Sequence, residues 1–252
     1  MGMNQRQEWI LDRLRDHGRV EVASVAHELD TSEVTVRRDL DLLAESGVLR
    51  RVHGGAVSLL LRGEELPFGL RELEAGEAKL RIAELVGGLI RDGEAVIVDS
   101  GTGGLALARV LAGRRVTAVP LSLPAAAALS GGPDVTVILP GGTLRPGEGA
   151  LTGPITESAL RSLRVDTAVI TCCGLSPADG IMAHDLPEAS VKRTAMVSAQ
   201  RTILMAEAAK FSRSALAVVA PLAEVDLLVT DVDAPAGAIA ETRRLGLTVH
   251  QA

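Results

Sequence analysis

The chain has 252 residues and a formal net charge of −6, with 47% hydrophobic and 23% charged residues. These values are typical of a globular protein of one or two domains, and they exclude general disorder and collagen-like structure. Trp9, Phe68 and Phe211 are the only aromatic residues, which argues against stacking platforms for single-stranded nucleic acid and predicts aliphatic cores.

The N-terminus does not have the pattern of a secretory signal. Arg6, Glu8 and Asp12 come before any long apolar run. Further along the chain, the longest uncharged stretch, 116–133, is interrupted by prolines and glycines, whereas a helix needs about 20 apolar residues to cross a bilayer. We therefore expect a cytoplasmic protein with no membrane partner.

Residues 1–57 have the pattern of a small helical domain with a hairpin. Apolar residues at helical spacing predict three short helices between residues 4 and 47, and Asp30-Thr31-Ser32 supplies capping residues for the third. The segment 48–57 combines β-branched residues, arginines and a glycine pair, which predicts a β-hairpin. Together these elements predict a winged helix-turn-helix, followed by a linker over residues 58–75.

The third predicted helix is the candidate DNA-reading element. Val36, Leu40 and Leu43 form its buried side, which turns Arg37 and Arg38 outward. In helix-turn-helix proteins the amino end of this helix enters the major groove, where Arg binds guanine or phosphate. The candidate DNA-binding residues of the helix and the hairpin are Ser32, Thr35, Arg37, Arg38, Arg50, Arg51 and His53.

An ordinary solvated helix face is the alternative to this DNA-binding surface. Residues 1–57 contain ten acidic residues against eight arginines. DNA binding therefore requires local clustering of the cations to outweigh the net repulsion between the acidic protein and the phosphates.

The remaining residues, 76–252, alternate apolar runs with helical segments. A helix is expected at 77–90, and the candidate strands are 95–98, 116–119, 135–139, 165–171, 202–205, 215–219, 226–230 and 247–249. This alternation predicts an α/β domain with a mainly parallel sheet and helices on both faces. Ligands of such sheets bind outside the carboxyl ends of the strands.

A glycine-rich turn follows the first of these strands. It runs from Asp99 through Ser100, Gly101, Thr102 and Gly103, and a helix is expected from 105 to 111. Free backbone amides and hydroxyl groups in such a turn bind anions, although tight packing alone also selects glycine. The turn matches neither the Walker loop nor a full dinucleotide fingerprint. A second glycine loop, at Gly141 and Gly142, is expected at the same edge of the sheet.

Lysine is rare in this chain, since Lys79, Lys192 and Lys210 are the only lysines among 26 basic residues. Glu188 and Lys192 are four residues apart and share a helix face, which fits an ordinary helix salt bridge or a ligand site. In an enzyme, Asp99 and Glu188 would perform acid–base chemistry on a sugar. In a sensor, the same groups would hold a phosphorylated ligand without turnover.

The cysteines argue against disulfide and metal chemistry. Cys172 and Cys173 are adjacent and are the only two in the chain. Adjacent residues do not easily meet disulfide geometry, and two cysteines are too few for a disulfide framework or a zinc finger. We expect no metal ion and no other cofactor.

Several motifs of this chain match one known family. They include Thr35-Val36-Arg37-Arg38-Asp39-Leu40, His53-Gly54-Gly55-Ala56, Asp99-Ser100-Gly101-Thr102, Gly141-Gly142, Gly174, Glu188, Lys192 and Lys210-Phe211. On these residues the sequence resembles the DeoR-type transcriptional regulators over nearly its whole length.

This resemblance implies a bacterial repressor of sugar-metabolism genes and not an enzyme. It implies a winged helix-turn-helix followed by a sensor domain similar to ribose-phosphate isomerases and CoA transferases, assembled as a homo-oligomer. The effector would be a phosphorylated sugar or a related anionic metabolite. The residues implied to line its pocket are Asp99, Ser100, Gly101, Thr102, Gly103, Gly141, Gly142, Gly174, Glu188, Lys192 and Lys210.

The chain departs from the family pattern in the sensor half. Apolar or smaller residues replace polar ones at Pro120-Leu121, Cys172-Cys173 and Ala208-Ala209. A buried sugar hydroxyl left without a partner costs about 1–3 kcal/mol, so the usual sugar phosphate would bind poorly. We expect either a less hydroxylated ligand, still anionic because Lys192 and Lys210 are retained, or a protein that binds DNA constitutively with a vestigial pocket. An isomerase or transferase with an accessory domain is the enzymatic alternative.

Overall fold

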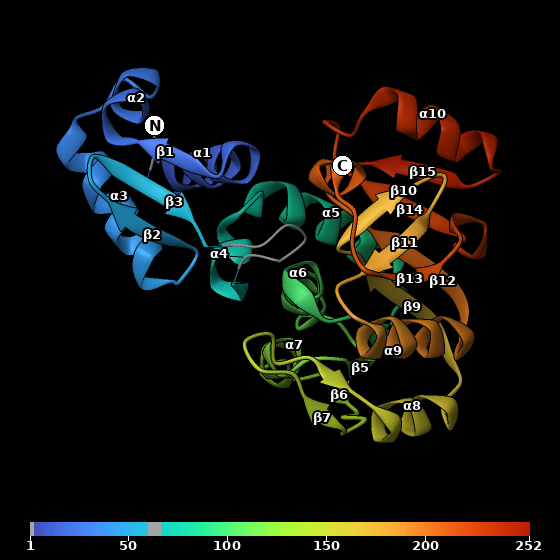
Figure 1. The fold of residues 1–252 in the computed structure, drawn as a ribbon. Helices are drawn as coiled ribbons and strands as arrows, with labels where there is room; N and C mark the ends of the chain where they lie inside the picture. Colours follow the sequence, from blue (N-terminus) through green and yellow to red (C-terminus); the bar gives the residue numbers. More distant parts are fainter. Residues whose placement is uncertain (1–2, 60–66) are drawn as a thin grey trace. The chain divides into compact units, whose positions relative to one another are not determined.

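The computed structural model describes residues 3–59 and 67–252 (Figure 1). The chain divides into two compact units, Met1–Glu74 and Ala75–Ala252. No helix of the described residues is both long and apolar enough to cross a membrane.

The first unit is a winged helix-turn-helix, as predicted. Its elements are α1 (Met3–His17), β1 (Arg19–Glu21), α2 (Val22–Glu28), α3 (Glu33–Glu45), β2 (Leu49–Val52), β3 (Gly55–Ser58) and α4 (Phe68–Leu73). The strands form an antiparallel sheet in the order β1-β3-β2. The hairpin β2–β3 is the predicted wing, whereas β1 and α4 were not predicted.

The predicted apolar faces form the core of this unit. Val36, Leu40 and Leu43 of α3 are buried against α1, α2 and the sheet. A buried ion pair also joins α1 to α3, because Arg6 Nε lies 2.8 Å from Asp39 Oδ2 and the Asp39 side chain is 3% exposed. This core fixes the angle at which α3 presents its opposite face to solvent.

Trp9 contributes to this unit as well. Its ring packs, partly buried, against the core, and the guanidinium carbon of Arg13 lies 5.2 Å from the ring centroid. Such a cation–π contact holds an aromatic ring at the protein surface in a defined orientation.

Ser32 caps the amino end of α3. Its Oγ accepts a hydrogen bond from the Thr35 backbone N–H at 3.1 Å. Because an uncapped helix leaves this amide unsatisfied, we expect Ser32→Ala to lower the free energy of unfolding by about 1 kcal/mol in urea denaturation. Ser24→Ala, at an exposed position of α2, is the matched control. Equal stability of the two variants would contradict the capping role.

The second unit is built on a parallel sheet with the strand order β15-β14-β12-β9-β4-β5-β6. In chain order these strands are β4 (Ala95–Val98), β5 (Thr117–Pro120), β6 (Thr136–Val137), β9 (Val165–Thr171), β12 (Ala199–Met205), β14 (Leu227–Thr230) and β15 (Thr248–Gln251). Each includes residues of a predicted strand, which confirms the mainly parallel sheet.

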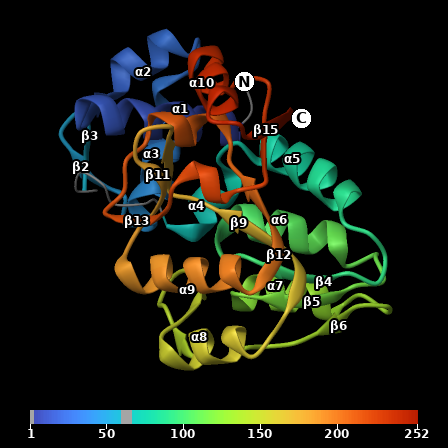
Figure 2. The same ribbon diagram turned by 90° about the vertical axis from the view of Figure 1, so that its right-hand side faces the viewer.

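Helices cover both faces of this sheet, as predicted (Figure 2). One face packs against α5 (Gly76–Leu89), α6 (Gly101–Leu111) and α7 (Leu123–Ser130). The other packs against α8 (Pro154–Arg161), α9 (Leu186–Val197) and α10 (Ala236–Arg244). Alternate residues of β4 serve the two cores, since Val96 and Val98 face the first set of helices and Ile97 faces the second.

The strand predicted at 215–219 does not join the parallel sheet. It is β13 (Ala217–Ala220), which pairs antiparallel with β11 (Gly180–Ala183), and β11 pairs with β10 (Gly174–Ser176). The link from β12 to β13 contains only the short 3-10 helix η1 (Ala208–Ser212), whereas a parallel crossover requires about a dozen residues or more, usually with an α-helix. A second 3-10 helix, η2 (Leu222–Glu224), and a two-stranded sheet of β7 (Thr143–Leu144) and β8 (Leu151–Thr152) complete the unit.

The helix predicted to begin at residue 105 begins four residues earlier, at Gly101. Glycine disfavours helices, but packing overrides this preference at the start of α6. A Cβ atom on Gly104 would lie 1.9 Å from the Asp99 carbonyl oxygen. Glycine therefore lets the first turn of α6 approach the end of β4.

Candidate functional site

The outer face of α3 carries the predicted arginine pair. Arg37 and Arg38 are both exposed. Arg37 Nη2 lies 2.5 Å from Glu33 Oε2 on the same helix. Arg38 makes no ion pair or hydrogen bond with the residues that the structure describes. One guanidinium of the pair is therefore available for another partner without breaking an internal contact.

The wing adds further polar side chains, of which some are exposed and one is paired within the protein. Arg50 and His53 are exposed, and His53 lies in the turn between β2 and β3. Arg51 is half-buried, since its Nε lies 2.9 Å from Asp41 Oδ1 and its Nη1 donates to the Gly55 carbonyl at 3.0 Å. Arg51 thus fastens the wing to α3, whereas Arg50 and His53 project from it.

Ser32 and Thr35 lie at the amino end of α3, as predicted. Their hydroxyl oxygens are 2.8 Å apart, and the Ser32 hydroxyl also forms the helix cap. The structure therefore brings the predicted DNA-binding residues together in one unit.

In the second unit, a buried charged cluster lies at the carboxyl ends of β4 and β9. Asp99 Oδ2 accepts hydrogen bonds from the Thr171 backbone N–H (2.8 Å), the Thr171 hydroxyl (3.0 Å) and Lys192 Nζ. Asp99 Oδ1 accepts one from the Ser100 N–H at 2.8 Å. The Asp99 and Lys192 side chains are each 2% exposed. The residues predicted for the first glycine turn and for α9 are therefore in direct contact.

This cluster continues along α9. Lys192 Nζ lies 3.2 Å from Glu188 Oε1, and Arg145 Nη1 lies 3.0 Å from Glu188 Oε2. Asp185 caps α9 through the Glu188 N–H and lies 3.8 Å from Arg145 Nε. Burial alone would lower the pKa of Lys192, but the Asp99 and Glu188 carboxylates outweigh it and raise that pKa above its ordinary value. Lys192 is therefore a permanent cation at neutral pH.

Lys210 belongs to a neighbouring cluster. Its Nζ lies 3.5 Å from Glu207 Oε1, and Lys79 Nζ of α5 lies 3.9 Å from the same oxygen. Burial would raise the pKa of Glu207, but the charges of Lys210 and Lys79 lower it below its ordinary value. All three lysines are thus buried beside carboxylates of the second unit.

The pKa of Glu207 predicts a dependence of stability on pH. Its folded-state pKa lies below the unfolded-state value of about 4.5, so below this pH the unfolded chain takes up the proton first. The stabilisation by Glu207 is therefore present above pH 4.5 and is lost as the pH falls through the folded-state pKa. We expect the stability difference between wild type and Glu207→Gln to shrink from pH 7 to pH 3 in urea denaturation.

The matched control for this experiment is Glu241→Gln, at an exposed position of α10. Its stability difference from wild type is expected to stay small over the same pH range, because surface substitutions have small effects. A Glu207→Gln difference that stays constant with pH would contradict the lowered pKa.

Both cysteines are buried, and charges of the two clusters act on Cys172. Burial raises the pKa of the Cys172 thiol to about 12, although the Lys210 charge opposes this shift. A thiol with this pKa is protonated at neutral pH and is a poor nucleophile. No three metal-ligating side chains come together in residues 3–59 and 67–252.

A small cavity adjoins the Asp99–Lys192 pair. It has a volume of about 10 Å³, which is room for roughly one water molecule. Its lining residues are Asp99, Ser100, Leu121, Ala150, Leu151, Thr152, Glu188, Val191 and Lys192.

The other predicted pocket residues are glycines and a threonine. Gly101, Thr102 and Gly103 form the first turn of α6, next to Asp99. The Gly141 carbonyl accepts a hydrogen bond from the Thr156 hydroxyl at 2.7 Å. Added Cβ atoms would lie 1.9 Å from Thr156 Oγ1 at Gly142 and 2.2 Å from the Arg213 carbonyl at Gly174. The structure therefore assigns close packing to Gly142 and Gly174.

Sequence reasoning missed Arg145, Thr171 and Asp185. Thr171 ends a predicted strand, and Asp185 precedes a proline at the start of a helical segment. These positions in the sequence could have marked both residues as candidates for the site. Arg145 lies in a glycine- and proline-rich segment, where a lone arginine has no periodic pattern to mark it. Its role depends on a contact with residues about 40 positions away, at Asp185 and Glu188.

Two family models match the chain and divide it between them. The model of the DeoR-like helix-turn-helix domain matches residues 6–60, and that of the DeoR C terminal sensor domain matches residues 74–232. Together with the winged helix and the buried site of the α/β unit, these matches define a DNA-binding transcriptional regulator. The chain belongs to the DeoR family. The prediction of a regulator that is not an enzyme is therefore confirmed.

Curated relatives agree with this assignment. The chain is 32% identical over 228 residues to the transcriptional repressor AccR of Agrobacterium fabrum, which covers 90% of this chain and 88% of the relative. It is 34% identical over 237 residues to the transcriptional repressor CsqR of Escherichia coli, covering 92% and 89%. It is 29% identical to the glycerol-3-phosphate regulon repressor of Escherichia coli, covering 93% of each chain.

Solved structures match more distantly. A probable sor operon regulator from Shigella flexneri has a TM-score of 0.42 and 12% identity, covering 68% of this chain and 88% of its own. A ribose 5-phosphate isomerase from Methanocaldococcus jannaschii has a TM-score of 0.41 and 13% identity, covering 55% of each chain.

Proposed function

We propose that this regulator is a cytoplasmic repressor of carbohydrate-metabolism genes that binds operator DNA as a homo-oligomer. The outer face of α3 carries this proposal, because it combines an exposed Arg38 with a helix end held by the Ser32 cap. Several of its relatives are named repressors, and one is the repressor of a glycerol-3-phosphate regulon. A homo-oligomer would present paired copies of α3 to repeated half-sites.

In this proposal the DNA-binding domain comprises residues 1–57, the linker residues 58–75 and the sensor residues 76–252. The side chains that contact the operator are those of α3 and the wing. Arg38 and Arg50 bind bases or phosphates directly, whereas Arg37 first has to exchange Glu33 for DNA. Arg51 both contacts the operator and, through its ion pair with Asp41, holds the wing so that His53 can reach the DNA. The proposed contact residues are Ser32, Thr35, Arg37, Arg38, Arg50, Arg51 and His53.

The sensor half binds a small phosphorylated sugar or another anionic metabolite at the Asp99–Lys192 site. Lys192 and Lys210 supply positive charge, and the first turn of α6 supplies backbone amides. The residues proposed to line the ligand are Asp99, Ser100, Gly101, Thr102, Gly103, Gly141, Gly142, Gly174, Glu188, Lys192 and Lys210.

A cavity of about 10 Å³ is far too small for such a ligand. In this proposal the ligand enters this cavity in a second conformation, in which the segment around β7 and β8 moves away from α9. Arg145 links this segment to Glu188 and Asp185, so these ion pairs break when the site opens. A ligand that favours the open form shifts the population of the two conformations and thereby the affinity for DNA.

One observation favours a different role, that of a constitutive DNA-binding protein with a vestigial pocket. The cavity beside the Asp99–Lys192 pair is small, and the cations Lys192 and Arg145 are already paired with carboxylates. Apolar Leu121 also lines the small cavity. Such a protein would bind its operator equally well with and without any metabolite.

A mobility-shift assay with DNA from the gene's own upstream region tests these proposals. We expect a shifted complex that is weakened or strengthened by a metabolite found in a thermal-shift screen of phosphorylated sugars and related acids. A shift that no metabolite changes, together with no thermal stabilisation, would favour the constitutive protein. The absence of a shift at low salt with every local promoter fragment would refute operator binding.

A further inference from the structure

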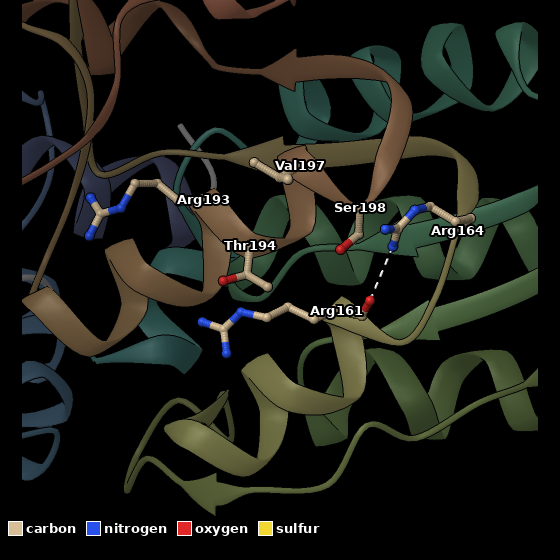
Figure 3. A pocket seen from close by; sticks show the side chains of 6 residues that line it. All are labelled: Arg161, Arg164, Arg193, Thr194, Val197 and Ser198. Carbon is tan, nitrogen blue, oxygen red and sulfur yellow. Dashed lines mark hydrogen bonds between the residues drawn. The ribbon is translucent and has the colours of Figure 1, made fainter.

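A second pocket lies at the opposite end of the parallel strands from the Asp99 site. It has a volume of about 390 Å³ and is lined by Arg161, Arg164, Arg193, Thr194, Val197 and Ser198 (Figure 3). Arg164 directly precedes β9 and Ser198 directly precedes β12, so the pocket lies at the amino ends of these strands. Asp99 and Thr171 lie at the carboxyl ends of β4 and β9. The two sites are therefore separate.

The lining of this pocket is strongly cationic. It contains three guanidinium groups and no carboxylate. The nearest acidic partner is Glu157, whose Oε2 lies 2.6 Å from Arg161 Nη2 and whose Oε1 accepts a hydrogen bond from Ser190 at 2.8 Å. Among the residues described, Arg164 and Arg193 form no ion pair. Two positive charges are thus left without a carboxylate, unlike the paired cations of the Asp99 site.

Both of these arginines keep an edge of the guanidinium group for another partner. Arg164 Nη1 donates to the Leu163 carbonyl at 2.7 Å and to the Arg161 carbonyl at 3.1 Å. Arg193 Nη1 donates to the Val218 carbonyl at 2.7 Å. These bonds fix the side chains through one nitrogen and leave Nε and Nη2, an edge that binds the oxygens of a phosphate or carboxylate in a bidentate manner.

Two of the arginine side chains are oriented so that one ligand can contact both. Figure 3 shows Arg161 of α8 and Arg193 of α9 extending toward the same side of the pocket, with Thr194 between them. Val197 is 83% exposed and supplies an apolar wall. A few cations around an apolar surface, within a volume of several hundred Å³, form the usual setting for a small charged ligand.

We propose that this arginine pocket is a second anion-binding site, which takes a small phosphomonoester. The phosphate group lies between the Arg161 and Arg193 guanidiniums, where Arg161 exchanges its Glu157 partner for the phosphate, and the carbon skeleton packs on Val197. Binding offsets the repulsion between the like charges that line the pocket. The site is independent of the ligand site proposed at Asp99.

Chemical modification of the full-length protein tests this proposal directly. The wild type is treated with an arginine-selective dicarbonyl reagent with and without inorganic phosphate at constant ionic strength, and the modified arginines are mapped by mass spectrometry. We expect phosphate to slow the modification of Arg161 and Arg193 at least threefold, and to leave Arg244, an exposed residue of α10, unchanged. Equal rates with and without phosphate at Arg161 and Arg193 would overturn the proposal.

Calorimetric titration with inorganic phosphate supplies an independent measurement. We expect the double variant Arg161→Gln/Arg193→Gln to bind phosphate at least 10-fold more weakly than wild type, whereas Arg244→Gln binds it equally well. Arg145→Gln, which alters the Asp99 site, is also expected to bind phosphate in the arginine pocket as wild type does. Loss of binding in Arg145→Gln alone, or no binding by the wild type, would refute the arginine pocket without refuting a sensor at Asp99.

Discussion

Replacing Lys192 by methionine is expected to lower the free energy of unfolding by about 3–5 kcal/mol in urea denaturation at neutral pH. The Lys192 ammonium contacts Asp99, Glu188 and the Thr171 carbonyl, and it is 2% exposed. Methionine has a similar volume but leaves the Asp99 carboxylate buried without its cation. Removing one partner of a buried pair costs more than the pair contributes, because the remaining charge stays desolvated.

A double-mutant cycle separates this effect from the loss of packing. Asp99→Asn removes the charge that Lys192→Met leaves unpaired, so the double variant is expected to be more stable than the sum of the two single effects predicts. Arg244→Met, at an exposed position of α10, is expected to change stability by less than about 0.5 kcal/mol. A Lys192→Met variant that loses no more stability than Arg244→Met would refute the buried ion pair.

Replacing Arg38 by alanine is expected to weaken operator binding by about 1–3 kcal/mol, which is about 5- to 150-fold in Kd. Arg38 is exposed on α3 and has no internal partner among the described residues, so its substitution leaves the fold intact. The dependence of Kd on salt distinguishes the type of contact. Loss of a phosphate contact lowers the salt slope by about one, whereas loss of a base contact relaxes sequence specificity.

Arg37 provides an internal comparison for this experiment. Its guanidinium is already paired with Glu33, so DNA has to replace that pair, and we expect Arg37→Ala to weaken binding less than Arg38→Ala. Arg91→Ala, at an exposed position of the second unit, controls for the change of net charge. The α3 surface would be excluded if Arg38→Ala bound the operator as tightly as Arg91→Ala.

The elements that the sequence predicted well are those with long periodic patterns. Val36, Leu40 and Leu43 recur at helical spacing, and each is buried in the structure. The elements that it missed are short or depend on distant partners. In β1 only Val20 is buried, and one buried residue cannot show the alternation of apolar and polar residues that marks a strand. An apolar run such as β13 predicts a strand but does not reveal which sheet it joins.

The candidate ligand site was predicted only in part, because local patterns mark some of its residues whereas the contacts among them join distant parts of the chain. Asp99 directly follows the end of a buried strand, and Glu188 and Lys192 share a helix face, so local rules marked all three. The contact between Asp99 and Lys192 spans 93 positions and depends on the strand order of the sheet. The ion pairs of Arg145 with Asp185 and Glu188 likewise arise only from the tertiary fold.

The position of Trp9 has a practical consequence for spectroscopy. The chain has no tyrosine, and its single indole lies in the winged helix unit, against the core that also supports α3. Emission excited at the red edge of tryptophan absorption therefore follows the unfolding of the winged helix unit alone, because the α/β unit contains no tryptophan. Circular dichroism follows both units, so the two signals together resolve two transitions without any added label.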